Sequence, residues 1–364
     1  MRKKPLLTVE HRHPDADVLV VTGGWPNDER DTYCVFIKRQ MESLVERGLR
    51  CDVLFIRGYR SPLAYPLAML RLALWSVSGK RRYRLVHAHG GEAALAAAFY
   101  RRAPLLVSYM GDDLLGTPRS DASIYLSSRI RRSIIRRHSR VASRTITKSR
   151  EMQAVLPRKV QAVNTVLPNG VDTDLFQPFD RTAARRELGW NANERVALFV
   201  GDPALARKRH FLAKAAVQLA RRELPDLRLE VAHGVTPDRI PLLMNGADCL
   251  LLTSSIEGSP NVVKEALMCN LPVIATPAGD ITELLEGVVP SNVREPSESA
   301  LCDALVECLR EPRRSNGREV SARLDSRIVA DSLLALYYEI APGLTLEAEP
   351  ALSSGAATAE PSPA

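Results

Sequence analysis

Two carboxylates, Glu257 and Glu265, stand eight positions apart in the segment EGSPNVVKE at 257–265. An apolar run of strand length at 247–253 precedes them, and Pro260 favours the first turn of a helix, where its missing N–H is not needed. This pattern predicts that Glu257 lies in the loop before the helix and Glu265 in the second turn. Carboxylates in these two places can accept hydrogen bonds from the hydroxyls of a sugar.

The same helix start offers donors for an anion. The backbone N–H groups of Asn261, Val262 and Val263 have no partner inside a helix, and with the positive end of the helix dipole they can hold a phosphate. We therefore expect Ser259, Asn261 and Val262 to contact a phosphorylated donor, and Glu265 belongs to the same donor-binding segment. The alternative is that the two glutamates are ordinary loop and solvated helix residues, and spacing alone leaves both interpretations open.

Cations follow another strand-like run. The apolar run at 196–200 ends at Gly201, and the loop behind it carries Arg207 and Lys208. Two cations at the end of a strand suit the negative charge of a diphosphate leaving group, and a glycine lets the backbone approach it closely. The alternative is a solvated basic helix start, and the sequence ranks neither cation above the other.

Glycines also follow the first strand-like run of the chain, at 17–22. Gly23 and Gly24 would allow the backbone to approach a diphosphate, and the alternative is an ordinary turn. We expect both glycines on the donor-binding side of a cleft.

Strand-like and helix-like segments alternate through the chain, which predicts parallel sheets with helices on both faces. In the first half we expect strands at 17–22, 51–56, 85–87, 105–109, 145–148 and 162–167, with helices at 35–47, 66–77 and 92–100. In the second half we expect strands at 196–200, 228–232, 247–253 and 272–275, with helices at 211–222, 238–245 and 331–340. Ligands of open α/β sheets bind outside the carboxyl ends of the strands, so two such domains would hold a substrate between them.

These motifs together resemble those of family-4 retaining glycosyltransferases. The resemblance covers about residues 17–340 and is carried by GGWP at 23–26, HAH at 87–89, GDDLLG at 111–116, LPNGVD at 167–172, FVG at 199–201, EGSPNVVKEA at 257–266 and PVIA at 272–275. Within that family the glutamate segment is most similar to envelope-polysaccharide and teichuronic-acid-type glycosyltransferases. The resemblance implies an α/β protein of GT-B architecture, in which two Rossmann-like parallel-sheet domains face a central cleft.

The length of 364 residues agrees with two domains of ordinary size. A turn-rich stretch at 168–178 predicts a hinge, and we place the boundary near residue 175. The expected units are an acceptor-binding domain at 1–175, a nucleotide-sugar-binding domain at 176–324, a helix at 325–341 that crosses back in resembling proteins, and a disordered tail at 342–364.

The resemblance also implies a reaction. A hexose-type sugar would move from a UDP or GDP sugar to a glycan or lipid-linked acceptor in cell-envelope or exopolysaccharide biosynthesis, with retention at the anomeric carbon. Glu265 would bind the ribose hydroxyls and Glu257 the hydroxyls of the sugar, whereas Arg207 and Lys208 would hold the diphosphate. A nucleotide-sugar epimerase of the same fold is the alternative, because it would use the same cleft with acid and base groups.

The chain departs from the family pattern at two positions. Many members have Arg directly after the glycine at 201, where this chain has Asp202, and many have His where this chain has Met110. His89, at the end of a strand-like run, is the remaining histidine candidate for catalysis or acceptor contact, although a structural hydrogen-bonding role fits it equally well.

Three polar residues, Asp112, Asp113 and Asn169, are expected on the acceptor side of the cleft. The two aspartates are adjacent and form no Asp-x-Asp pair, and proteins that resemble this chain need no metal for catalysis. We therefore expect neither a metal nor a cofactor.

The charge pattern indicates a further partner. The net charge is +8, and the stretch from Arg129 to Arg150 holds eight arginines, one lysine and no acid, interleaved with isoleucines at near-helical spacing. Such a basic amphipathic helix fits an anionic membrane surface carrying a polyprenyl-linked acceptor, and the alternative is a solvated helix face with snorkelling arginines. Nucleic acid is not expected as a partner, because aromatic residues make up only 5% of the chain and no nucleic-acid-binding signature is present.

Six cysteines without a CxxC pair favour reduced thiols over disulfides or a zinc site. We expect neither a signal peptide nor a membrane-spanning helix, since every apolar run is short or interrupted by charge. The expected location is the cytoplasm, with peripheral contact at the inner face of the plasma membrane.

Overall fold

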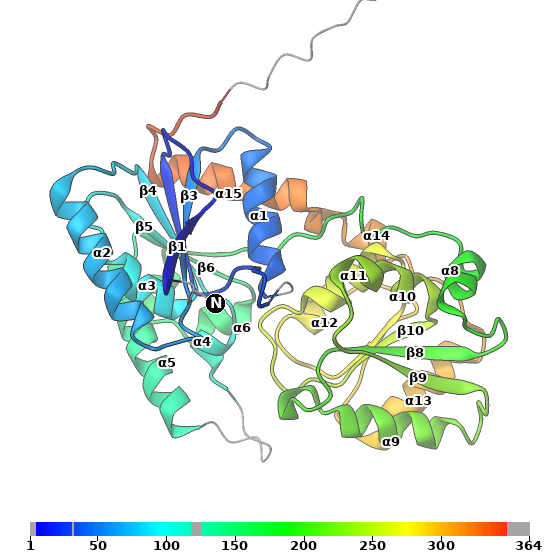
Figure 1. Cartoon of the computed structure of the whole chain (residues 1–364). Helices are drawn as coiled ribbons and strands as arrows, with labels where there is room; N and C mark the ends of the chain where they lie inside the picture. Colours follow the sequence, from blue (N-terminus) through cyan, green and yellow to red (C-terminus); the bar gives the residue numbers. More distant parts are fainter. Residues whose placement is uncertain (1–4, 31–32, 118–124, 348–364) are drawn as a thin grey trace, which may run out of the picture.

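The structure, a computed structural model, describes residues 5–30, 33–117 and 125–347, which form two α/β units side by side (Figure 1). The first unit contains a seven-stranded sheet in the order β1-β3-β2-β4-β5-β6-β7. Its strands are β1 Leu7–Glu10, β2 Val18–Thr22, β3 Cys51–Ile56, β4 Leu85–His89, β5 Leu105–Ser108, β6 Arg144–Thr147 and β7 Asn164–Val166. Strands β2 to β7 run parallel, and β1 pairs antiparallel with β3 at the edge.

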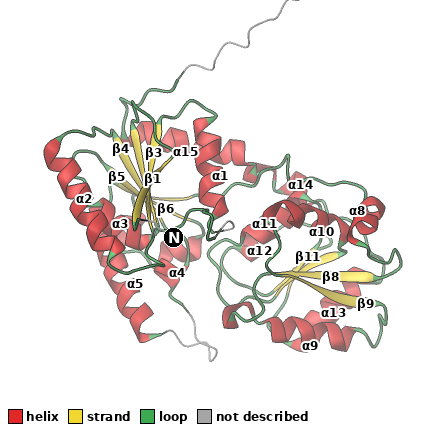
Figure 2. Ribbon diagram, viewed as in Figure 1, coloured by secondary structure: helices red, strands yellow, loops and turns green. Residues whose placement is uncertain are grey.

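Helices cover both faces of this sheet (Figure 2). One face packs on α2 (Ala64–Ser78), α3 (Gly91–Ala97) and α5 (Leu126–His138), and the other packs on α1 (Val35–Val45) and α15 (Ser326–Ile340). The short helices α4 (Asp112–Leu115), α6 (Arg150–Ala154) and α7 (Arg158–Gln161) complete the unit. Strands β2 and β3 are buried along their whole length, as a parallel sheet covered on both faces requires.

The second unit contains a five-stranded parallel sheet in the order β12-β11-β10-β8-β9. Its strands are β8 Arg195–Val200, β9 Leu227–Ala232, β10 Cys249–Leu252, β11 Val273–Ala275 and β12 Asn292–Val293. The helices α9 (His210–Ala220) and α13 (Glu298–Leu309) cover one face, and α10 (Ile240–Gly246), α11 (Asn261–Met268) and α12 (Ile281–Leu284) cover the other. Around these lie α8 (Arg181–Leu188) and α14 (Gly317–Val320).

The expected architecture of two parallel-sheet α/β domains is confirmed, and each strand expected from the sequence is present. One expectation is wrong in its extent, because the basic stretch from Arg129 to Arg150 is not a single helix. The helix α5 ends at His138, and Arg144 already lies in β6, where it pairs with Glu339 of α15. The buried, β-branched run of β6 belongs to the sheet, so only the first part of the basic stretch presents a helical face.

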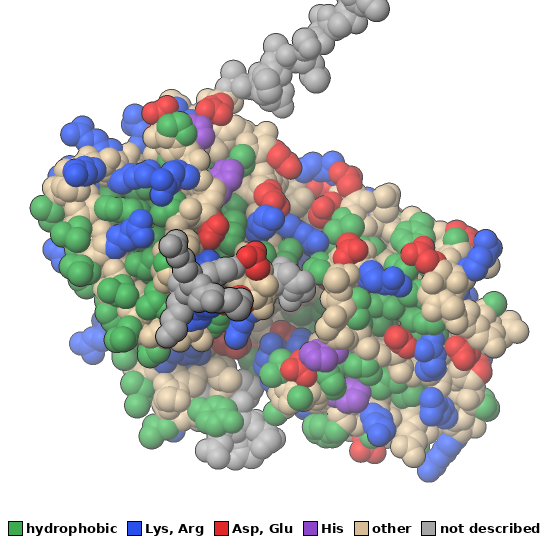
Figure 3. All heavy atoms as spheres, in the orientation of Figure 1, with side chains coloured by type: hydrophobic (Ala, Val, Ile, Leu, Met, Phe, Trp, Pro, Cys, Tyr) green, Lys and Arg blue, Asp and Glu red, His purple; other side chains and the backbone are tan. Residues whose placement is uncertain are grey.

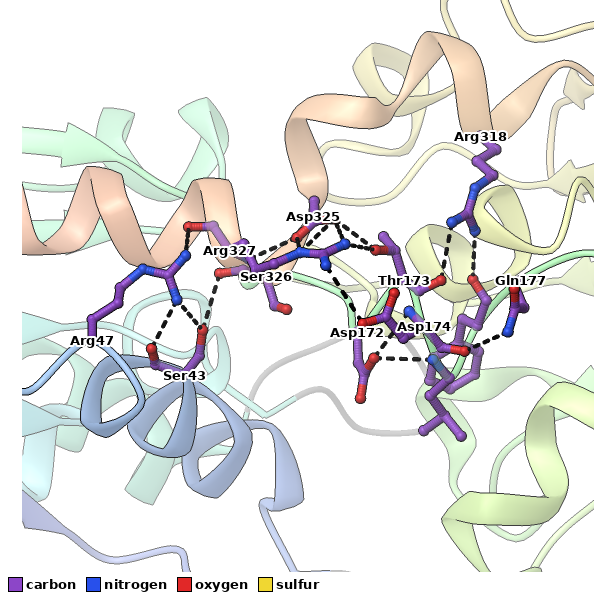
Figure 4. A network of polar contacts seen from close by, with 12 residues as sticks. Ser43, Arg47, Asp172, Thr173, Asp174, Gln177, Arg318, Asp325, Ser326 and Arg327 are labelled. Carbon is purple, nitrogen blue, oxygen red and sulfur yellow. Dashed lines mark hydrogen bonds and ion pairs between the residues drawn. The ribbon is translucent and has the colours of Figure 1, made fainter. Parts of the chain in front are cut away.

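The chain passes between the units twice, after β7 and again before α15. The two crossings lie side by side, because the Val171 N–H donates to the Leu324 carbonyl and the Ser326 N–H donates to the Val171 carbonyl, both at 2.8 Å. Figure 4 shows the polar contacts around them, in which the guanidinium of Arg327 binds the Asp325 carboxylate at 2.7 Å. The two linkers therefore form one joint.

The returning helix α15 belongs to the first unit by its packing. Ala330, Leu333 and Tyr337 are buried in the same apolar core as β2 and α1. On its outer side, the guanidinium of Arg47, just after α1, donates to the Arg327 carbonyl at 2.9 Å. The first sheet therefore needs a helix from the far end of the described chain to complete its core.

The tail expected from residue 342 begins with packed residues. Leu344 is buried, and the Glu347 N–H donates to the Gly48 carbonyl at 2.9 Å. The expectation of a disordered tail is therefore wrong for residues 342–347, because Leu344 packs in the apolar core of the first unit. The rest of the expected tail, 348–364, lies outside the described residues.

In both sheets the strand order reverses next to the first parallel strand. The reversal lies between β2 and β4 in the first sheet and between β8 and β10 in the second. Open α/β sheets bind ligands outside the carboxyl ends of the strands at such a point. The loops after Thr22, His89, Val200 and Leu252 are therefore the places to examine for a site.

Candidate functional site

Lys208 and Glu257 form a charged pair at the reversal point of the second sheet. The loop after β8 carries Lys208 and the loop after β10 carries Glu257, with Nζ and Oε1 2.6 Å apart and each side chain only 12% exposed. Arg207 approaches the same carboxylate less closely, with a guanidinium nitrogen 3.4 Å from Oε1 and 27% of the side chain exposed. The structure thus brings together three residues that the sequence singled out, and places Lys208 nearer to Glu257 than Arg207.

Arg209, the third cation of this cluster, has a structural role. It adopts a left-handed backbone with φ of 46°, and its guanidinium donates to the Thr253 carbonyl at 2.7 Å and to the Ser254 carbonyl at 2.9 Å. These bonds join the loop after β8 to the loop after β10. They hold Lys208 and Glu257 at a fixed separation, which a preorganised charge site requires.

Two glycines keep the site narrow. Gly201 has a φ of +140°, and a Cβ there would stand 3.5 Å from Cε of Lys208. A Cβ at Gly258 would stand 3.2 Å from the Met110 carbonyl oxygen and 3.3 Å from the Gly111 Cα. The Gly258 loop of the second unit therefore abuts the loop after β5 of the first unit, and the units meet beside the charged pair.

The helix α11 begins at Asn261, one residue later than expected. Pro260 caps it with an extended ψ of 116°, and the Val263 N–H donates to the Pro260 carbonyl at 3.2 Å. Of the three expected backbone donors, Val263 is thus already bonded, and Asn261 and Val262 remain at the start of the helix. Ser259 lies in the loop directly before them, partly exposed.

Glu265 lies within α11 and lines a cleft between the units together with Asn261 and Arg39 of α1. Burial raises the pKa of Glu265, whereas the positive charges of Arg39 and Lys264 oppose this shift. A carboxylate at this place can accept hydrogen bonds from a diol such as a ribose. Sequence reasoning missed Arg39, because nothing in its local pattern indicates which unit it faces.

Two buried lysines bind the linker that follows β7. The Lys264 ammonium donates to the Asn169 carbonyl at 2.9 Å, and the Lys148 ammonium donates to the Leu167 carbonyl at 3.3 Å. Burial lowers the pKa of Lys264 to about 8 and that of Lys148 to about 7. Neither lysine was predicted from the sequence as a site residue. The position of Lys264 directly before Glu265 could have indicated that it lies near the site.

Asn169 lies beside the start of α11. Its side-chain amide donates to the Asn261 Oδ1 at 3.4 Å, and Asn169 is only 7% exposed. The structure therefore places Asn169 against the first residue of α11, and its expected role on the acceptor side stays a prediction.

Asp113 shapes the loop that faces the second unit. It is 5% exposed, and its carboxylate accepts N–H bonds from Gly91, Met110, Gly111 and Leu114 at 3.0 to 3.2 Å. Burial raises its pKa to about 6, and the backbone donors oppose the shift. Its oxygens are thus occupied by backbone groups.

Asp112 differs from its neighbour. It is exposed at the start of α4, and its backbone carbonyl accepts a hydrogen bond from Arg131 at 3.2 Å. The adjacent aspartates therefore point to different surroundings, and only Asp112 presents its carboxylate to solvent.

His89 ends β4 at the reversal point of the first sheet. It is 3% exposed, and neither ring nitrogen has a hydrogen-bond partner within the described part of the chain. Burial lowers its pKa to about 3, so the imidazole is neutral near pH 7. Its neighbour His87 is fully bonded, with Nδ1 2.6 Å from the Tyr337 hydroxyl and Nε2 2.8 Å from the Ser108 hydroxyl. The free nitrogens of His89 can bind a substrate hydroxyl, but the group is a weak base.

Gly23 and Gly24 follow β2 as expected. A Cβ at Gly23 would stand 2.7 Å from the Tyr65 hydroxyl, and one at Gly24 would stand 2.4 Å from the Cys34 Sγ. A Cβ at Gly24 would therefore collide with the Cys34 side chain, and one at Gly23 would have to displace the end of the Tyr65 side chain. Contact of the two glycines with a donor stays a prediction.

Within residues 5–30, 33–117 and 125–347, no three His, Cys, Asp or Glu side chains gather in a way that could hold a metal ion. No helix of the described chain has the length and apolarity to cross a bilayer. All six cysteines have free thiols.

Two family descriptions match the two halves of the chain. Residues 9–175 match "Glycosyltransferase Family 4", and residues 195–311 match "Glycosyl transferases group 1". The first match includes β2 to β7 of the first sheet and the end of β1, and the second includes the strands of the second sheet.

Curated relatives carry the name D-inositol 3-phosphate glycosyltransferase. The protein of Geodermatophilus obscurus is 30% identical over 208 residues, which are 47% of this chain and 46% of that protein. The protein of Segniliparus rotundus is 29% identical over 217 residues, covering 50% of this chain and 47% of that protein. The match thus spans about half the length of these relatives.

Solved structures share the fold. Sucrose-phosphate synthase from Thermosynechococcus elongatus aligns with a TM-score of 0.70 at 17% identity, over 88% of this chain and 98% of that one. HepE from Anabaena, in complex with UDP and glucose, aligns with a TM-score of 0.64 at 19% identity, over 88% of this chain and 99% of that one. At these identities the likeness shows the arrangement of two units and nothing finer.

Proposed function

Because the chain belongs to the glycosyltransferases described as Family 4 and group 1, we propose that it transfers a sugar from a nucleoside-diphosphate donor to an acceptor hydroxyl. The observation that carries this proposal is the arrangement of Lys208, Glu257 and the start of α11. A cation that is largely sheltered from solvent, a carboxylate and backbone N–H donors meet at the carboxyl ends of β8 and β10, opposite the first unit. These are the groups that a diphosphate and a sugar need.

The proposed donor binds with its diphosphate on Lys208 and Arg207 and its ribose on Glu265. Glu257 pairs with Lys208 at 2.6 Å, so a diphosphate binds beside a cation that this carboxylate holds in position. Glu257 then turns its second oxygen to the hydroxyls of the sugar. A cation fixed before the reaction stabilises the charge of the leaving group without reorganisation.

In the proposed transfer, the bond between the anomeric carbon and the phosphate oxygen breaks, and its electron pair stays on the nucleoside diphosphate. The acceptor oxygen forms the new bond to the same carbon, on the same face, so the anomeric configuration is retained. The acceptor proton passes to the departing phosphate oxygen. This route suits a cleft in which His89, with a pKa of about 3, is a poor base but can orient a hydroxyl.

The finer assignments extend this proposal. The donor is a UDP or GDP hexose, which is supported by the UDP and glucose bound to HepE. The acceptor is a glycan or polyprenyl-linked saccharide of the cell envelope, and the enzyme works in the cytoplasm at the inner face of the plasma membrane. The reaction needs no metal in this proposal, and transfer that continues in EDTA would support that part.

The test is calorimetric titration of the full chain with UDP, GDP and ADP, repeated with Glu265→Ala. We expect one nucleotide to bind, and the substitution to weaken it at least tenfold because two ribose hydroxyls lose a charged acceptor. The sugar conjugate of that nucleotide is then incubated with and without acceptor saccharides. A changed sugar without acceptor would indicate an epimerase, and no binding of any nucleotide would contradict the transferase.

A further inference from the structure

One side of the first unit carries an apolar surface that no other part of the described chain covers. Leu63, Leu67, Leu70, Leu74 and Val77 follow one another along α2 in steps of three and four residues, each between 46% and 81% exposed. Such steps bring side chains onto one stripe of a helix. Soluble monomers seldom leave a contiguous stripe of this kind in water, so it indicates a partner.

A second stripe lies on α5. Leu126, Ile130 and Ile134 are 70%, 55% and 51% exposed and follow one another in steps of four. A groove beside them is lined by the arginines of α5 and of the turn after it, Arg129, Arg132, Arg136, Arg137 and Arg140. None of these arginines has an ion-pair partner in the described chain, and Arg132 donates a hydrogen bond to the Leu115 carbonyl at 3.1 Å.

The two stripes belong to one face. The helices α2 and α5 lie on either side of α3 and pack on the same side of the sheet. At their carboxyl ends, Phe99, His138 and Val141 line one hollow, and Arg102 donates to the Val77 carbonyl at 3.3 Å. Figure 3 shows hydrophobic side chains along this side of the molecule, with lysines and arginines between and around them. We call this surface the α2–α5 face.

The positive charge of the α2–α5 face indicates which kind of partner it binds. Neither α2 nor α5 contains an acidic residue, and Lys80, Arg82 and Arg101 are exposed at the end of the face. Apolar side chains bordered by cations fit a bilayer with anionic lipids, because leucines enter the acyl boundary while arginines stay at the phosphates. We propose that the α2–α5 face binds the surface of an anionic lipid bilayer.

Both helices of the face begin on the side of the first sheet where its parallel strands end. The helix α2 follows β3 and α5 follows β5, so both helices begin near the carboxyl ends of the strands, where the candidate site lies. An acceptor with its lipid in the bilayer can enter the cleft from this edge. That consequence rests on the proposed function, whereas binding to lipid does not.

The test is cosedimentation of the full chain with phosphatidylcholine vesicles, with and without phosphatidylglycerol, at low and high salt. We expect binding only to the anionic vesicles, weakened by salt. The double substitution Leu67→Gln and Leu74→Gln leaves the net charge of the protein unchanged. It should lower the partition coefficient at least about tenfold, because two leucine side chains are no longer transferred from water into the bilayer. The control is Ile328→Gln, an exposed aliphatic residue on the opposite face, which should leave binding unchanged.

A second experiment tests the contribution of charge with the double substitution Arg136→Gln and Arg137→Gln. This variant should bind anionic vesicles more weakly, and its binding should depend less on salt concentration. Its control is Arg186→Gln with Arg222→Gln, which removes the same charge from exposed positions of the second unit. Equal loss in both pairs would show attraction to net charge alone and would overturn the proposal, as would no binding to anionic vesicles. The face could instead bind a second copy of this chain, and sedimentation velocity tests this. A dimer that dissociates when Leu67→Gln and Leu74→Gln are introduced would assign the face to that second copy and overturn the proposal.

Discussion

Lys208 and Arg207 contact the same carboxylate but should differ in their contribution to donor binding. Lys208 is 2.6 Å from Glu257 and 12% exposed, whereas Arg207 is 3.4 Å away and 27% exposed. A hydrogen bond between charged groups sheltered from solvent contributes about 1.5–3 kcal/mol, and a solvent-exposed pair about 0.2–1 kcal/mol. Lys208→Ala should therefore weaken binding of the nucleoside diphosphate roughly 10- to 150-fold, and Arg207→Ala by less than about fivefold.

The Lys208→Ala variant also leaves Glu257 beside the diphosphate without its main partner, and like charges then repel. Lys208→Ala combined with Glu257→Gln should bind the nucleotide more tightly than Lys208→Ala alone, which separates repulsion from the lost contact. Turnover should fall by about 100-fold or more in Lys208→Ala, the scale of one preorganised donor.

The assay is calorimetric titration with the nucleotide, with thermal unfolding as the check on folding. Lys214→Ala, which removes an exposed lysine on α9 of the same unit, is the matched control. Binding of a folded Lys208→Ala variant within threefold of wild type, or a larger loss in Arg207→Ala, would refute the assignment of Lys208 as the principal diphosphate ligand.

Three further predictions concern buried polar groups. Asp113→Ala should lower the free energy of unfolding by about 3 kcal/mol or more, because several backbone N–H groups lose their acceptor; denaturant titration measures it, and a loss under 1 kcal/mol would contradict this role. Tyr337→Phe should cost about 1–2 kcal/mol in the same titration, since the buried His87 Nδ1 loses its partner at 2.6 Å, and an unchanged midpoint would show that the bond contributes nothing. Between pH 7 and 10 the free energy of unfolding should rise, because Lys148 has a pKa of about 7 when folded and about 10.4 when unfolded, so the unfolded chain binds more protons. Lys148→Met should flatten that rise, and an equal slope in both proteins would show that Lys148 does not titrate this way.

The strands and the glutamate segment were predictable because their signals are local. The strand before Glu257, β10, is apolar from Cys249 to Leu252, which is what a strand buried on both faces needs, and Pro260 marks a helix start within one residue. The short edge strand β1 was missed, since four partly buried residues give too little periodicity. The helix α13 was left unassigned although Ser297 caps it, a signal that the sequence did contain.

Parts of the site depend on long-range contacts that no local pattern reveals. Arg207 and Arg209 look alike in the sequence, but only Arg209 turns inward to the carbonyls after β10. The contacts of Asp113 could not be predicted locally either, because one of its backbone donors is Gly91, which follows a different strand. Arg39 reaches the cleft of Glu265 only because α1 lies against the joint between the units.

The double crossing makes the second unit an insertion into the first. Its entry near Val171 and its exit near Asp325 lie side by side, and the core of the first unit is complete only when α15 returns to it. A module whose two ends adjoin can be exchanged as one cassette. A chimera joined at these two points would transplant Lys208, Glu257 and Glu265 together, while the α2–α5 face stays with the recipient. Cutting the chain once at the apparent boundary would instead leave the first unit without one of its helices.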